Sequence, residues 1–129
     1  MAKKAGQSKS QAAATAAAGR GPFDREHLER ATHGDRSLAR EVLMLFDGQA
    51  ERLLEAIAAA TDKKKRGELA HSLKGAARGV GAFALADAAE EIEAEGDDPI
   101  TVIAAVARLS ARVAEAKLVL ADLLASPSS

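Results

Sequence analysis

Four segments of the chain repeat their apolar residues with the 3.6-residue period of an α-helix, and this pattern constrains the fold more than any other feature. These helices are expected at about 35–60, 61–79, 82–95 and 99–125, and a shorter one at 24–32. Helices joined by such short connections pack beside their neighbours. We therefore predict an all-α fold, an antiparallel up-down-up-down four-helix bundle with a short extra N-terminal helix.

Capping residues and apolar positions define these segments further. Gly34 is expected to end the short helix, and Asp35 to cap the first long one. Gly96 is expected to close the third long helix, and Asp98 with Pro99 to start the last. The apolar positions expected to form the stripes of the first and last long helices are Leu38, Val42, Leu45, Phe46, Leu53, Ala56 and Ile57, and then Ile103, Val106, Leu109, Val113, Leu120 and Leu124.

The composition excludes several kinds of site. The chain contains no cysteine, so disulfides and thiolate metal sites are excluded. Its three histidines, His27, His33 and His71, lack the spacing of a zinc-binding HExxH motif, so we expect no metal and no cofactor. No glycine-rich phosphate-binding motif is present, so we also expect no ATP site.

Charge and hydropathy indicate where the chain works. Its 129 residues carry a formal net charge of −1, which gives no general attraction to nucleic acid or to an anionic membrane. Charged residues interrupt the apolar run of 99–125, so we expect no membrane span and a cytoplasmic location. Residues 1–21 are expected to form a flexible tail, 22–125 the bundle, and 126–129 a C-terminal tail.

His71 is the residue whose surroundings point most clearly to chemistry. On a helical wheel of about 100° per residue, Leu69 and Leu73 fall opposite His71, so the imidazole is expected on the solvent side. Gly67 and Gly75 lie one turn before and one turn after it. Glycine inside a helix costs about 0.5–1 kcal/mol relative to alanine, and bare backbone here would let a bulky partner approach. For Gly67, a place in the loose start of the helix is an equal alternative.

Charged residues surround the same histidine. Lys74 and Arg78 lie three and seven positions after it, and Lys64 and Glu68 share its face of the helix. Cations around an imidazole suit a phosphoryl group, which carries about two negative charges. The alternative is an ordinary surface histidine with no partner.

The helix after the turn offers a carboxylate to this imidazole. The turn centres near residue 80 or 81, so residues ten to twelve positions beyond it should lie level with the histidine. Glu90, Glu91 and Glu93 occupy this window, and the spacing does not separate them. A carboxylate bound to Nδ1 would fix the tautomer and leave Nε2 as the nucleophile.

The stretch "AHSLKGAARGVGAFALADAAEEIE" resembles the signature of histidine phosphotransfer (HPt) domains: a histidine, one spacer, Leu-Lys-Gly, small residues, then Gly-Ala and an amphipathic helix with acidic residues. The similarity extends from about Phe23 to Leu124, because "FDREHLERATHGDRSLAREVLMLF" also looks like the family's first segments. Ala76 and Ala77 depart from the pattern, since serines are frequent at both positions.

The resemblance implies a four-helix bundle that relays phosphoryl groups in two-component signalling. His71 matches the phosphoacceptor, Lys74 the lysine that assists the phosphoryl group, and Gly75 the glycine that opens the surface to a receiver domain. The family's Gln or Glu that bonds the histidine falls at Glu93. Lys64, Gly67, Glu68, Gly75 and Arg78 are the expected partner-binding residues.

The predicted function is that of a stoichiometric phosphorelay carrier, not an enzyme with its own ATP site. Its expected partners are response-regulator receiver domains, which would supply Mg²⁺, and a sensor or hybrid histidine kinase. The single solvent-facing site fits a monomer. Two alternatives stay open: a helical interaction module that binds such partners without accepting phosphate, and an acceptor domain cut from a longer kinase.

Overall fold

The structure is a computed structural model that describes residues 22–125, and the two predicted tails, 1–21 and 126–129, lie outside the described residues. Within this range the chain forms helices and no strand. The helices are α2 (Arg25–Ala31), α3 (Arg36–Ala59), α4 (Lys63–Gly79), α5 (Phe83–Ala94) and α6 (Pro99–Ala125).

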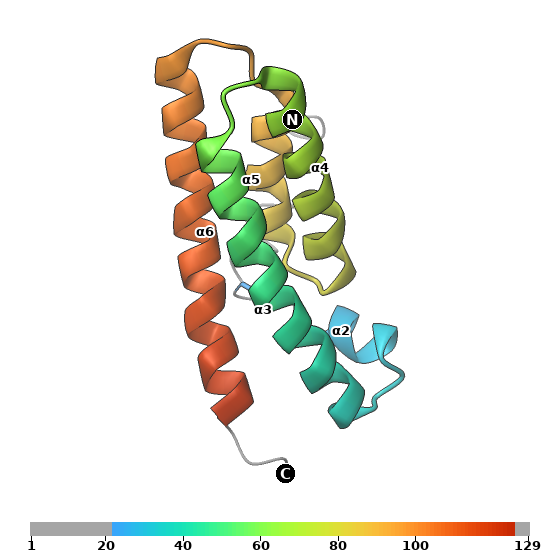
Figure 1. The fold of residues 1–129 in the computed structure, drawn as a ribbon. Helices are drawn as coiled ribbons and strands as arrows, with labels where there is room; N and C mark the ends of the chain where they lie inside the picture. The colour runs from blue at the N-terminus through green and yellow to red at the C-terminus, as the bar shows by residue number, and fades with distance from the viewer. Residues whose placement is uncertain (1–21, 126–129) are drawn as a thin grey trace, which may run out of the picture.

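The four long helices form a closed ring of neighbours. Helix α3 packs on α4, α4 on α5, α5 on α6, and α6 back on α3. Figure 1 shows these helices side by side, with the α3–α4 and α5–α6 connections at one end and the α4–α5 turn toward the other. Helix α2 lies near the start of α3, at the end away from the α3–α4 connection (Figure 1). The prediction of an all-helical bundle with an extra short helix is confirmed.

Aspartates begin four of the five described helices, and α5, which follows Ala82, has no side-chain cap. Asp24, Asp35 and Asp62 accept hydrogen bonds from the backbone N–H three residues later, and Asp98 accepts from the N–H of Ile100. Each bond satisfies a donor that has no partner inside the helix. The predicted boundaries therefore agree with the observed ones within two residues.

The helix ends follow the predictions less closely. Gly34 has a φ of +73°, the left-handed conformation expected of a terminating glycine. Gly96 does not adopt this conformation, and α5 instead ends at Ala94 and is capped by Glu95, whose N–H donates to the carbonyl of Ile92. The expected closure of this helix by Gly96 is therefore wrong.

The core is rich in alanine because the four helices approach one another closely. Its fully enclosed large side chains are Ile57, Leu73, Leu85, Leu109 and Leu120, and between them lie Ala70, Ala77, Ala82, Ala86, Ala89, Ala105 and Ala116. Burying a leucine or isoleucine contributes about 1.5–3 kcal/mol, so these few side chains carry much of the stability.

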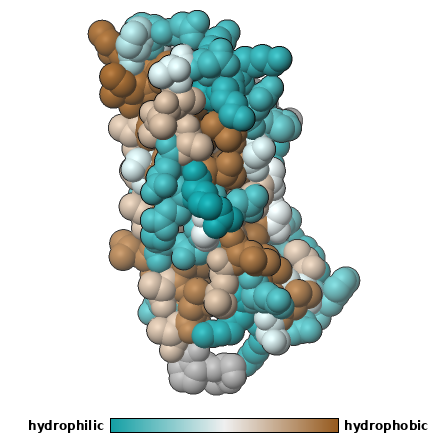
Figure 2. Space-filling view, in the orientation of Figure 1, coloured by the Kyte–Doolittle hydropathy of each residue, from teal (hydrophilic) through white to brown (hydrophobic). Residues whose placement is uncertain are grey.

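Three positions of the predicted apolar stripes do not reach the core. Leu38, Leu45 and Ile103 are exposed, Leu45 by 68 % and Ile103 by 67 %. On α3 the side that meets α4 and α6 is centred on Phe46 and Ala50, and Leu45 is turned away from it. Figure 2 shows hydrophobic surface at the end of the molecule where α6 begins. Ile100 and Ile103, in the first turns of α6, are exposed.

The segment before α2 fastens the α4–α5 turn. The ring of Phe23 packs edge-on against Phe46, with centroids 6.0 Å apart. The N–H of Asp24 donates to the carbonyl of Gly81 at 2.9 Å. Gly81 has a φ of +81°, and a Cβ there would lie 2.9 Å from the carbonyl oxygen of Asp24. Only glycine fits this turn without strain, and the turn sets how α5 lies against α4.

Candidate functional site

Helix α4 presents His71 to solvent because its apolar residues point the other way. Ala70, Leu73 and Ala77 are fully buried, whereas the His71 side chain is 68 % exposed. The 3.6-residue period turns these three residues about 100–160° away from the imidazole. The predicted outward direction of His71 is confirmed, although Leu69, which the wheel put opposite it, is only partly buried.

Helix α5 supplies the carboxylate that contacts this histidine. Glu93 Oε2 lies 2.7 Å from His71 Nδ1. The α4–α5 turn at 80–82 reverses the chain, so residues about ten before it and twelve after it lie level with each other. The spacing left three glutamates open for this position, the family resemblance pointed to Glu93, and the structure places Glu93 there.

Lys74 holds the other oxygen of the same carboxylate. Its Nζ lies 2.7 Å from Glu93 Oε1, and the lysine side chain is only 14 % exposed. Oε1 is enclosed and makes no well-aligned hydrogen bond, so this contact is described as an ion pair. The carboxylate therefore bridges an ammonium group and an imidazole that both belong to α4.

The ionisation of Glu93 follows from these two neighbours. Lys74 lowers the pKa of the Glu93 carboxyl most, His71 lowers it further, and burial opposes them. The carboxyl is therefore ionised near neutral pH, and an ionised carboxylate can only accept hydrogen bonds. The Nδ1–H of His71 then donates a hydrogen bond to Glu93 Oε2, and in the neutral imidazole this tautomer leaves the lone pair on Nε2.

The two other glutamates have different partners. Glu91 accepts two hydrogen bonds from Arg108 of α6, at 3.0 and 2.8 Å. Glu90 lies 3.4 Å from Arg78, the cation predicted one turn beyond Lys74. Arg78 is thus half-exposed and already faces a carboxylate, whereas Lys74 lies in direct contact with the pair that includes the histidine.

The surface of α4 around the histidine is open. Lys64, Glu68 and Gly75 are exposed, and Gly67 is partly buried. A Cβ added at Gly67 or Gly75 would meet no atom within 4 Å. The fold therefore does not require glycine at either position, and the open backbone is a property of the surface beside His71.

A comparison with known families shows whether this arrangement of histidine, lysine and glutamate is typical of a family. The model of the Hpt domain family matches residues 41–124, which is more than half of the chain and includes α4 and α5 entirely. The chain belongs to the Hpt domain family. Neither the curated proteins nor the solved structures give a match to this Hpt domain.

One basic residue of this Hpt domain has a role that the sequence reading missed. Arg66 lies five residues before His71 in a run of basic residues, yet its side chain is only 7 % exposed. It donates to the carbonyl of Gly96 at 3.3 Å and lies 3.5 Å from Asp97. Arg66 therefore ties the start of α4 to the α5–α6 connection. The helical wheel held the signal, because it places Arg66 about 140° from His71.

Asp87, one turn before Glu91 on α5, extends the charged surface of the Hpt domain. Burial raises the pKa of its carboxyl, Glu90 raises it further, and Arg78 opposes them.

The described residues include no group of three or more His, Asp or Glu side chains placed to hold a metal ion. None of the described helices is long and apolar enough to cross a membrane.

Proposed function

We propose that His71 accepts a phosphoryl group from a receiver-domain aspartate and passes it to another receiver domain. The observation that carries this proposal is the chain of contacts from Lys74 through Glu93 to Nδ1 of an exposed imidazole. An ordinary surface histidine needs no such support. The family membership of the chain favours the same reading.

In the proposed transfer, the lone pair on Nε2 attacks the phosphorus of the aspartyl phosphate in line. An N–P bond forms, the P–O bond to the aspartate breaks, and the aspartate leaves as a carboxylate. The positive charge that develops on the imidazole is stabilised through the Nδ1–H bond to Glu93. The remainder of the catalysis is positioning and charge stabilisation, with Mg²⁺ supplied by the partner receiver.

The neighbours of His71 divide the remaining work. Lys74 offsets part of the phosphoryl charge from its place beside Glu93. Gly75 keeps a low surface on which the receiver docks, and Lys64, Gly67, Glu68 and Arg78 surround that docking surface. The protein is then a stoichiometric carrier in the cytoplasm rather than an enzyme with an ATP site.

The antiparallel up-down-up-down order of the four long helices is part of this proposal. It is supported by connections of three or four residues and by the closed ring of neighbours. This order places α4 and α5 as one hairpin, so that a receiver meets both the histidine and its glutamate on the same surface.

The test is phosphotransfer from an isolated receiver domain that carries labelled aspartyl phosphate. The wild-type chain should gain label that is stable in base and lost in acid, as expected of phosphohistidine. His71→Gln should gain none, and label that persists in this variant would refute the assignment. A binding module without phosphotransfer would instead bind the receiver and remain unlabelled in both forms.

A further inference from the structure

A cavity of about 470 Å³ lies at the end of the bundle where α2, the start of α3 and the end of α6 meet. Its apolar lining includes Leu28, Ala39, Leu43 and Leu123, which come from all three helices. Leu28 and Leu43 are buried, and Ala39 and Leu123 are partly buried. The volume is within the range of about 300–1,000 Å³ that is typical of small-molecule sites. None of the residues that line the cavity is part of the His71 site.

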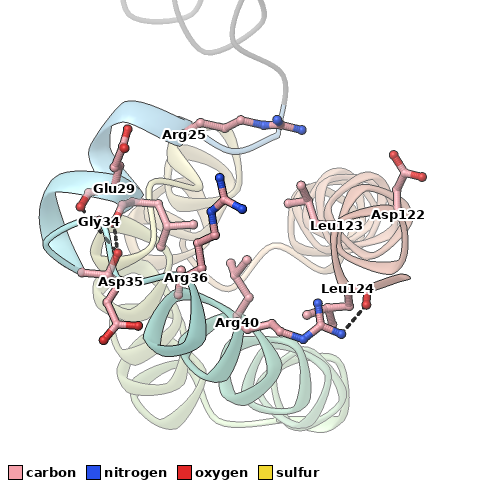
Figure 3. A pocket seen from close by; sticks show the side chains of 13 residues that line it. Arg25, Glu29, Gly34, Asp35, Arg36, Arg40, Asp122, Leu123 and Leu124 are labelled. Carbon is pink, nitrogen blue, oxygen red and sulfur yellow. Dashed lines mark hydrogen bonds between the residues drawn. The ribbon is translucent and has the colours of Figure 1, made fainter. Parts of the chain in front are cut away.

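Arginines border this cavity. Figure 3 shows Arg25 and Arg36 with their guanidinium groups over the opening between α2, α3 and α6. Neither side chain has a hydrogen-bond or ion-pair partner among the described residues. A third arginine, Arg40, also lines the cavity and donates to the carbonyl of Leu124.

Three acidic residues also line the cavity. Figure 3 shows the carboxylates of Glu29, Asp35 and Asp122 directed away from the opening. Asp35 is occupied as the N-cap of α3, where it accepts from the N–H of Leu38 at 3.0 Å. Within residues 22–125, the two guanidinium groups at the mouth of the cavity therefore have no ion-pair partner, and they lie above an apolar floor.

We propose that this cavity binds a small anionic amphiphile, a carboxylate or phosphate monoester with a short alkyl chain. Guanidinium groups hold carboxylates and phosphates through paired N–H bonds, and Arg36 with Arg25 provides the donors. The alkyl chain lies against Leu28, Leu43 and Leu123, where burial of its methylene groups favours binding. Neither part of the ligand needs His71, so this site is independent of the phosphotransfer proposal.

The test uses the full chain and four probes: octanoate, octyl phosphate, octan-1-ol and inorganic phosphate, all below the concentrations at which micelles form. Methyl NMR shifts of the leucines and calorimetric titration measure the binding. At least one of the two charged amphiphiles should bind saturably and shift Leu28, Leu43 and Leu123. Octan-1-ol lacks the anionic head group and inorganic phosphate lacks the alkyl chain. Each should therefore bind at least about tenfold more weakly than the charged amphiphile. Comparison of octanoate with octyl phosphate identifies the preferred head group.

Variants test the role of the arginines. Arg36→Ala and Arg25→Ala should each weaken binding of the charged amphiphile about tenfold or more. Arg52→Ala removes an exposed arginine of α3 outside the cavity lining and should leave binding unchanged. His71→Gln should also bind like the wild type, whatever the result of the phosphotransfer test.

Four results would overturn the proposal. The first two are that the alcohol binds as tightly as the charged amphiphiles, or that inorganic phosphate binds as tightly as octyl phosphate. The third is that Arg52→Ala weakens binding as much as Arg36→Ala. The fourth is that neither amphiphile shifts the three leucines saturably. Circular dichroism of each variant confirms that helix content is retained, because the substituted arginines are exposed.

Discussion

Gly75→Ala is expected to stabilise the protein and to slow its phosphorylation. The new methyl group meets no atom within 4 Å, so it causes no clash inside the folded chain. Alanine is favoured over glycine inside a helix by about 0.5–1 kcal/mol. For a domain of this size, that gain raises the melting temperature by about 2–8 °C.

The same methyl group lies one turn from His71, on the exposed surface of α4. If a receiver packs closely on Gly75, the extra volume costs about 1–3 kcal/mol at the interface. That cost lowers the second-order rate constant for transfer from the phosphorylated receiver by roughly 5- to 150-fold. Rapid-quench measurement of the label on His71 gives this rate, and thermal unfolding gives the stability.

Gly79→Ala is the matched control. Its new methyl group also meets nothing within 4 Å, but it lies two turns from His71, at the end of α4. It should stabilise the chain without slowing transfer. If Gly75→Ala is stabilised yet is phosphorylated at the wild-type rate, the reasoning that the open backbone serves receiver docking is wrong.

Three further predictions concern Glu93 and the α4–α5 turn. Glu93→Ala should slow phosphotransfer more than Glu91→Ala, because Glu91 contacts Arg108 rather than the histidine; the reverse order of rates would contradict this assignment. The pKa of Glu93 is lowered, so its contribution to stability is complete above the ordinary value of 4.5 and is lost as the pH falls through the lowered folded-state pKa. Urea unfolding of Glu93→Gln should therefore show a shallower loss of stability below pH 4.5 than the wild type, and parallel curves would exclude this linkage. Gly81→Ala should destabilise the chain by about 1–3 kcal/mol in the same assay, because φ is +81° and the Cβ would lie 2.9 Å from the Asp24 carbonyl; an unchanged midpoint would show that the turn adapts.

Local features of the sequence were sufficient for the helices and for the outward direction of His71. Caps such as Asp35 and Asp62 act on N–H groups three residues away, so a short window contains the signal. The stripe opposite His71 is equally local, since it depends only on the helical period. The errors at Leu45 and Ile103 arose because an apolar residue on a helix does not by itself reveal where the neighbouring helices lie.

The sequence by itself determined an all-helical chain, its boundaries, and a histidine on a helix face with glycine and cations beside it. The helical spacing did not separate the glutamates, and the family resemblance pointed to Glu93; the tertiary structure shows the contact itself, because Glu91 and Glu93 differ by a rotation of about 200° around α5 and only one of them can face His71. The orientation of α5 about its own axis, which decides which glutamate faces α4, is set by the packing of an alanine-rich core and by the tight turn at Gly81. The cavity near Arg36 is also a tertiary feature, since α6 returns to α3 from more than 80 residues along the chain, as the 84-residue separation of Arg40 and Leu124 shows.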